Sequence, residues 1–298
     1  MTATVYVNGR IGDDTQALIS VLDHGFLYGD GVYEVIRTYG RRPFALDRHL
    51  RRLRQSARLL DLPLPHSDPE LKAVVDSTVR AHLDGPGSAA PHSELYVRVV
   101  VTRGIGELSY AAPQAPPSLV AIVKTLPPHD ASLYERGVRA VIVPMIRNHP
   151  QSVNPRIKSN NLLNSAMAMR EAARRGAFEG IFRNYRGELA ECAMSNLFVV
   201  QHGVLKTPPL DAGILGGITR EIVLELAAAR GVPAQETALH DEDLFGASEA
   251  FVSVTTRELV PVVDVDGRPI GSGVPGDLTR ALLGAYRAFA QRNSGGGC

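Results

Sequence analysis

The sequence of 298 residues has no apolar run near the roughly 18 residues that a membrane-spanning helix needs. Its N-terminal stretch MTATVYVNGRIGDD lacks the basic-then-apolar order of a signal peptide. The two cysteines, Cys192 and Cys298, are too few for a disulfide framework and are not spaced as metal ligands. We therefore expect a cytoplasmic protein with reduced thiols and no bound metal.

Neither sign of charge is in large excess, since the chain has 32 lysines and arginines and 31 aspartates and glutamates. Hydrophobic residues make up 44% of the chain. This balance argues against a disordered chain and against a binder of nucleic acid, so the expected partners are small molecules. The length favours two domains that each bury a core.

Lysine is scarce: the chain has four lysines and 28 arginines. Arginine cannot easily lose its proton, whereas lysine can become a neutral amine nucleophile. Lys158 lies in the segment NPRIKSNNLLNSAMAMREAARRG, just before a helix expected over residues 160–175. The positive end of that helix would favour a neutral amine, as a Schiff-base lysine requires. The alternative is an ordinary solvated lysine at a helix start.

Strand-like and helix-like segments mix without strict alternation, which favours a mixed α/β or α+β fold. Asn8-Gly9 predicts a hairpin, and apolar periodicity predicts helices near residues 46–60 and 68–83. Pro127-Pro128 is the best linker, so we expect domains at 1–128 and 129–298, the second ending in a flexible tail at 290–298.

Two further segments could bind an anion and a cation. The loop GILGGITRE precedes a helix, so its backbone amides and the Thr219 hydroxyl could cradle a phosphate, although glycines there also suit a tight turn. Glu191 lies in a strand that otherwise reads as core. If buried, it needs a cationic partner, and a protonated pyridine nitrogen would be one.

Seven blocks resemble the class IV aminotransferases, the fold type IV enzymes that use pyridoxal 5′-phosphate. In order they are FLYGDGVYEVIRTY, LDRHLRRLRQSARLL, YVRVVVTRG, IKSNNLLNSAMA, GELAECAMSNLFVV, GGITRE and SVTTRELVPV. The resemblance implies a small N-terminal α/β domain and a larger C-terminal barrel-like domain, with the cofactor in the cleft between them. It also implies at least a homodimer, in which the neighbouring subunit completes the substrate pocket.

The resemblance assigns roles to individual residues. Lys158 would form the covalent imine with the cofactor and later move a proton between substrate and cofactor, and Glu191 would keep the pyridine nitrogen protonated. The expected phosphate ligands are Arg52, Gly217, Ile218, Thr219 and Thr255. The expected substrate pocket comprises Tyr28, Tyr33, Val35, Tyr96, Arg98, Thr256 and Arg257.

The blocks point to more than one subfamily. Tyr96 and Arg98 resemble the Tyr-x-Arg strand that orients carboxylates in branched-chain aminotransferases, whereas Val35 is closer to the D-amino-acid enzymes. Thr256 and Arg257 stand where branched-chain enzymes usually carry small residues, and Arg257 could bind a carboxylate or point to solvent.

The resulting hypothesis is a transaminase that moves the amino group of a hydrophobic, branched-chain-type L-amino acid to 2-oxoglutarate by a ping-pong mechanism, with relaxed specificity. The alternatives are a D-amino acid or (R)-amine transaminase, an aminodeoxychorismate lyase, and a cofactor-binding protein without enzyme activity.

Overall fold

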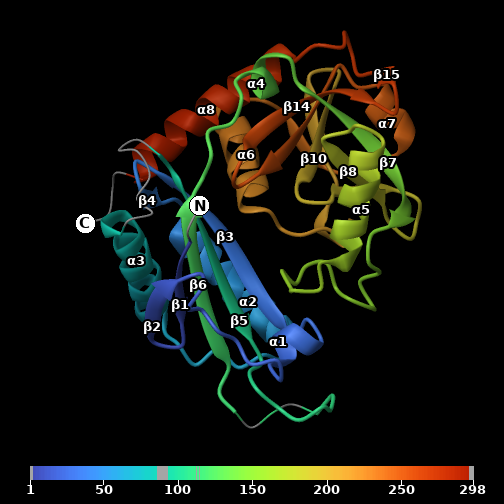
Figure 1. Ribbon diagram of the computed structural model, residues 1–298. Coiled ribbons are helices and arrows are strands. Elements are labelled where there is room, and N and C mark those ends of the chain that lie inside the picture. Colours follow the sequence, from blue (N-terminus) through green and yellow to red (C-terminus); the bar gives the residue numbers. More distant parts are fainter. Residues whose placement is uncertain (1–2, 86–92, 112, 114, 295–298) are drawn as a thin grey trace. The chain divides into compact units, whose positions relative to one another are not determined.

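The computed structural model describes residues 3–85, 93–111, 113 and 115–294. They form two compact units (Figure 1). The first unit holds the chain up to Pro128, the segment Ile157–Asn161 and the chain from Ala290 onward, and the second holds His129–Arg156 and Leu162–Phe289. The first unit thus includes Lys158, which the sequence-based boundaries put in the second domain. Within the described ranges, no helix is both long and apolar enough to cross a membrane.

The first unit is built on an antiparallel sheet with the strand order β2-β1-β6-β5-β3-β4. Its strands are β1 (Thr4–Val7), β2 (Arg10–Asp13), β3 (Gly31–Tyr39), β4 (Arg42–Pro43), β5 (Leu95–Thr102) and β6 (Ser118–Thr125). Asn8 and Gly9 both have positive φ, as the predicted tight hairpin turn requires.

Three helices accompany this sheet, namely α1 (His24–Leu27), α2 (Leu46–Leu59) and α3 (Asp68–Asp84). Helix α3 begins at a capping box formed by Ser67 and Glu70. The apolar side of α2, including Leu50 and Leu53, is fully buried with Ile36 of β3 in one core. Helices α2 and α3 therefore pack on one face of the sheet, and the alternate residues of β3 and β5 point to the other face.

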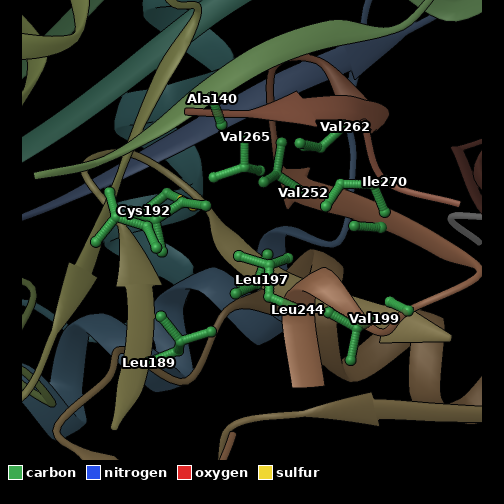
Figure 2. Close-up of a cluster of buried hydrophobic side chains, with 14 of the residues drawn as sticks. Ala140, Leu189, Cys192, Leu197, Val199, Leu244, Val252, Val262, Val265 and Ile270 are labelled. Atoms are coloured by element: carbon green, nitrogen blue, oxygen red, sulfur yellow. The ribbon is translucent and has the colours of Figure 1, made fainter. Parts of the chain in front are cut away.

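The second unit contains a nine-stranded mixed sheet with the order β12-β11-β10-β13-β14-β7-β8-β9 and with β15 paired to β14. The strands are β7 (Val138–Ile146), β8 (Glu179–Arg183), β9 (Leu189–Cys192), β10 (Asn196–Gln201), β11 (Val204–Thr207), β12 (Ala234–Glu236), β13 (Glu249–Val254), β14 (Glu258–Val265) and β15 (Arg268–Pro269). Its core includes Leu197, Val252 and Val262, which Figure 2 shows converging from different strands.

The chain connectivity requires this sheet to curl. Strands β10 and β9 are five strand spacings apart in the sheet order, which would separate them by about 24 Å in a flat sheet. However, β9 ends at Cys192 and β10 begins at Asn196, a step that spans at most about 15 Å. The sheet therefore bends into a barrel-like surface, and the turn between β9 and β10 lies where that surface closes.

The helices and short 3-10 helix of the remaining chain are α4 (Ser132–Glu135), α5 (Leu163–Arg174), η1 (Leu210–Ala212), α6 (Ile218–Ala229), α7 (Asp241–Phe245) and α8 (Asp277–Ser294). Helix α8 corrects the expected tail at 290–298, because the helix continues to Ser294 and Ala290 is fully buried. The last part of that expected tail, residues 295–298, lies outside the described residues.

Candidate active site

Lys158 lies in an extended segment along the edge of β3. The N–H of Tyr33 donates to the carbonyl of Lys158 at 2.9 Å, and the N–H of Asn160 donates to the carbonyl of Gly31 at 2.9 Å. Helix α5 begins only at Leu163, so the expected position of the amine beside a helix start is wrong. Because Lys158 and Tyr33 are paired across two strands, their side chains point to the same face.

That face gathers four of the expected substrate residues. Val35 of β3 pairs with Arg98 of β5, and Tyr33 and Tyr96 lie two residues away on their own strands. The Lys158 Nζ lies 4.5 Å from the ring centroid of Tyr33, and the Arg98 Cζ lies 4.0 Å from the same centroid. An amine and a guanidinium therefore share one electron-rich ring, which attracts both cations.

Tyr28 is placed differently from the other expected substrate residues. It follows α1 as its C-terminal cap, and its ring contacts those of His24 and Tyr110 at centroid distances of 5.0 and 5.2 Å. The structure gives it no contact with the Tyr33 ring among the described residues, so its expected place in the substrate pocket stays a prediction.

Arg52 belongs to a buried charged cluster between α2 and β3. Its Nε and Nη2 atoms both donate to the Glu34 carboxylate at 2.7 Å, and His49 Nδ1 lies 2.7 Å from the same carboxylate. Burial opposes ionisation of Glu34, but Arg52 and His49 outweigh it and hold the pKa of Glu34 at about 2. Arg52 is therefore fixed in place as a cation, which suits its expected role at a phosphate.

His49 connects this cluster to Lys158. Burial lowers the pKa of His49, and the nearby charges of Arg52 and Lys158 lower it further, against the opposing effect of Glu34. Its Nε2 atom is buried and has no hydrogen-bond partner among the described residues. The charge of Lys158 thus acts on this buried imidazole, although sequence patterns gave His49 no role.

In the second unit, Glu191 is buried and has cationic and amide partners. Its Oε1 accepts from Arg147 Nε at 2.8 Å, and its Oε2 accepts from Asn196 Nδ2 at 3.2 Å and from the N–H of Leu215 at 3.1 Å. Arg147 supplies the positive charge that a buried carboxylate needs.

The loop before α6 connects Glu191 to the expected phosphate cradle. Asn196 Nδ2 also donates to the carbonyl of Leu215 at 3.0 Å, and Gly217 is the N-cap of α6. A Cβ on Gly217 would lie 1.9 Å from Asn196 Oδ1, so glycine is required by this close approach. The N–H groups of Ile218, Thr219 and Arg220 follow in the first helical turn, where they have no intrahelical acceptor.

The turn at residues 255–257 joins β13 to β14, and side chains of the segment before β7 bond to its carbonyl groups. His129 Nε2 lies 2.9 Å from the carbonyl of Thr256, and the Tyr134 hydroxyl donates to the carbonyl of Arg257 at 3.2 Å. The Arg257 guanidinium lies 5.0 Å from the ring centroid of Phe178. Thr255 follows Ser253, which pairs with Asn196, so the turn begins near the Glu191 cluster.

These two sets of residues fit pyridoxal phosphate by their chemistry. In the second unit, a buried carboxylate suits a protonated pyridine nitrogen, and the start of α6 offers N–H donors and a positive dipole end to a phosphate. In the first unit, Lys158 supplies the amine and Arg52 a fixed cation. Spacing in the sequence did not reveal Glu34, His49, Arg147 or Asn196, because each meets its partner through the tertiary fold.

Comparisons with known proteins agree with this chemistry. The family described as "Amino-transferase class IV" matches residues 31–265. A putative branched-chain-amino-acid aminotransferase of Methanocaldococcus jannaschii is 38% identical over 284 residues, which are 95% of both chains. A D-alanine aminotransferase of Listeria innocua is 34% identical over 93% of both chains.

The fold agrees as well. A crystal structure of the branched-chain aminotransferase from Thermoproteus uzoniensis with norvaline superimposes with a TM-score of 0.88 at 34% identity, covering 98% of this chain and 96% of that one. The two sheets of the structure are thus those of a fold type IV enzyme. The family match, the two relatives and this structure agree that the chain belongs to the class IV aminotransferases, which are enzymes dependent on pyridoxal 5′-phosphate.

Proposed function

We propose that this aminotransferase moves the amino group of a hydrophobic L-amino acid, of the branched-chain type, to 2-oxoglutarate by a ping-pong mechanism. The donor leaves as a keto acid before 2-oxoglutarate enters and takes up the amino group. The relatives named as branched-chain aminotransferases support the choice of amino donor. The cytoplasmic location stays a prediction.

The observation that carries the proposal is the position of Arg98. Its guanidinium lies over the Tyr33 ring beside Lys158, and within the described residues it has no ion pair and no side-chain hydrogen bond. A half-buried guanidinium in this position suits a planar carboxylate, which it can bind through two parallel hydrogen bonds. Arg98 is therefore suited to hold the carboxylate of an amino acid near the reactive amine.

Each proposed role follows from the surroundings of the side chain. When bound, pyridoxal phosphate supplies an electron sink for the carbanion left at the substrate α-carbon. Lys158 is held at the edge of β3. Its Nζ would accept the proton from the substrate α-carbon and return it to the cofactor. Glu191 would keep the ring nitrogen protonated, while the start of α6 and Arg52 would hold the phosphate.

A D-amino acid transaminase is the second candidate. Val35, paired with Arg98, resembles the D-enzymes at a position where branched-chain enzymes usually carry glycine. The relative from Listeria innocua is named a D-alanine aminotransferase. Each enantiomer of the donor has one α-hydrogen, so with that hydrogen turned toward Lys158 the two candidates differ in which side of the pocket holds the carboxylate and which holds the side chain.

A half-reaction screen separates these candidates. The purified holoenzyme is mixed in turn with L-leucine, D-alanine, (R)-1-phenylethylamine and aminodeoxychorismate, and the loss of the bound-cofactor absorbance band is followed. We expect L-leucine to react fastest and 2-oxoglutarate to restore the band. Reaction with D-alanine but not with L-leucine would overturn the proposal, and pyruvate released from aminodeoxychorismate would favour a lyase.

The variant Arg98→Leu tests the carboxylate site. We expect the half-reaction rate with L-leucine to fall about 10- to 100-fold, because a hydrogen-bonded charge pair is lost. The rate with (R)-1-phenylethylamine, which has no carboxylate, should change little. Arg37→Gln is the matched control, since Arg37 lies on the same face opposite Tyr96. Equal losses for both amines would exclude Arg98 from carboxylate binding.

We also propose that the enzyme is a homodimer, and an apolar surface of the first unit supports this. Five large side chains project from residues 18–26 and 108–110, namely Leu18 (81% exposed), Val21 (69%), Phe26 (71%), Leu108 (75%) and Tyr110 (93%). The N–H of Gly106 donates to the carbonyl of Leu22 at 3.1 Å, so the two loops form one patch. Exposed apolar patches of this kind mark interaction sites.

The double variant Phe26→Glu, Leu108→Glu should convert the dimer into a monomer, because two carboxylates would have to be buried in the interface. Sedimentation velocity gives the mass, and the half-reaction with L-leucine gives the activity, which should be lost with the dimer. Val274→Glu, at an apolar position that is 56% exposed in the second unit, is the control. A double variant that remains dimeric would rule out this patch as the interface.

A further inference from the structure

We propose that Glu179 is a positioning residue that holds the Glu191 carboxylate in place through the turn from Cys192 to Ser195. The proposal rests on the role proposed above for Glu191 at the cofactor nitrogen. Glu179 lies on β8 and has no place in that chemistry itself.

Glu179 is almost completely buried, with 1% of its surface exposed, and its carboxylate faces the turn. Its Oε2 accepts from the Ser195 hydroxyl at 3.0 Å, and its Oε1 accepts from the N–H of Gly180 at 3.2 Å. A single buried carboxylate therefore binds the last residue of the turn.

The turn, in its turn, determines how Glu191 and Asn196 lie relative to each other. The N–H of Cys192 donates to the carbonyl of Ser195 at 2.8 Å, which closes the turn. Glu191 immediately precedes Cys192, and Asn196 immediately follows Ser195. Asn196 Nδ2 donates to Glu191 Oε2 at 3.2 Å, so the acceptor and its amide donor are held together by the residues that Glu179 anchors.

This placement is electrostatically costly, which argues that the carboxylate serves a purpose. Burial raises the pKa of Glu179 to about 7, against the hydrogen bond from Ser195 and the charge of Arg257. Burial and the charge of Glu179 also raise the pKa of the Cys192 thiol on β9. An apolar residue at this position would avoid that cost, but it could not accept the hydrogen bond of the Ser195 hydroxyl.

The raised pKa gives the cofactor-free protein a characteristic pH dependence. Between pH 4.5 and 7 the unfolded chain releases the Glu179 proton while the folded chain keeps it, so this group makes the protein less stable as the pH rises through that window. The loss is complete above the folded-state pKa. A variant without this carboxyl should lack this part of the pH dependence.

The experiment compares Ser195→Ala, Glu179→Ala and Glu179→Gln with the wild type. The dissociation constant of pyridoxal phosphate should rise about 10-fold in Ser195→Ala and Glu179→Ala, since each removes a buried hydrogen bond. Glu179→Gln, whose amide oxygen can still accept from Ser195, should lose less. In Ser195→Ala, the pH midpoint of the bound-cofactor absorbance should shift by about one unit, because Glu191 tunes the ring nitrogen.

A stability readout needs no cofactor. The Glu179 carboxyl should lower the melting temperature of the cofactor-free wild type by about 5 °C between pH 5 and pH 8. This fall should be smaller in Glu179→Gln. Glu249→Gln is the matched control, because Glu249 accepts from Leu278 and Thr279 at the start of α8. It should keep the wild-type pH profile and the wild-type affinity for pyridoxal phosphate.

The outcomes separate this inference from the function on which it rests. If Ser195→Ala and Glu179→Ala bind the cofactor like Glu249→Gln, and the absorbance midpoint of Ser195→Ala is unshifted, the positioning role is overturned while the role of Glu191 stands. If Glu191→Gln itself leaves that midpoint unchanged, the proposed role of Glu191 fails and this inference fails with it. Ser195→Ala removes the same hydrogen bond by changing the donor in the turn. It therefore still tests the proposal if the Glu179→Ala protein does not fold.

Discussion

Replacing Lys158 with alanine should abolish transamination and the covalent cofactor absorbance band together. The turnover of L-leucine with 2-oxoglutarate should fall by at least about 10⁴-fold, because the variant loses both the nucleophile and the group that carries the proton. The covalent link is checked separately by borohydride reduction and mass measurement of the intact chain. The wild-type chain should gain the mass of the reduced cofactor, and the variant should not.

Two further substitutions make this test specific for an amine at this position. Lys158→Arg keeps the positive charge beside Tyr33 but should be as inactive as alanine, since arginine cannot become a neutral nucleophile. Lys206→Ala is the control, because Lys206 donates to Gln201 in the β10–β11 hairpin. Retained turnover or a retained covalent band in Lys158→Ala would refute the assignment.

The local elements of the fold were predictable because short-range patterns determine them. The leucines of α2 recur at helical spacing, and the predicted range 46–60 differs by one residue from Leu46–Leu59. The turn at Asn8-Gly9 needs positive φ at both residues, which these residue types favour. The shared face of Tyr96 and Arg98 follows from strand alternation, but their pairing with β3 depends on register, which residue types alone left open.

The surroundings of Lys158 were not predictable from its neighbours in sequence. The predicted helix over 160–175 starts later because residues before Leu163 make long-range bonds in extended conformation. Asn161 Nδ2 donates to the carbonyl of Gly29 at 3.0 Å, and the N–H of Lys158 donates to Ser56 Oγ at 3.1 Å. Apolar periodicity measures helix propensity and carries no information on such contacts.

The same limit applies to the buried charges. Arg52 would be assigned to solvent from the pattern of its helix, but it forms two hydrogen bonds with Glu34, a residue of β3 that lies 18 positions earlier in the sequence. Glu191 could be predicted to need a cation, and the fold supplies Arg147 as one. Burial thus predicts that a partner must exist, while only the fold identifies it.

Replacing Glu191 with glutamine should slow transamination on the order of 10²- to 10³-fold while leaving the covalent link intact. The amide cannot hold a proton on the ring nitrogen, so the charge that develops at the substrate α-carbon is less stabilised. Lys158 is untouched, and the mass gained on borohydride reduction should match the wild type. Single-turnover rates for L-leucine and for 2-oxoglutarate measure the loss in each half-reaction.

The loss must be distinguished from a folding defect, because Glu191→Gln leaves the half-buried Arg147 without its carboxylate partner. The melting temperature of the cofactor-free variant measures the loss of folding stability. At temperatures well below that melting point the variant is folded, so slower transamination there reflects the chemistry and not unfolding. Glu188→Gln is the matched control, since Glu188 pairs with Arg186 in the hairpin before β9. If Glu191→Gln kept wild-type single-turnover rates, the carboxylate would have no role at the ring nitrogen, and its network with Arg147 and Asn196 would serve only the closure of the sheet.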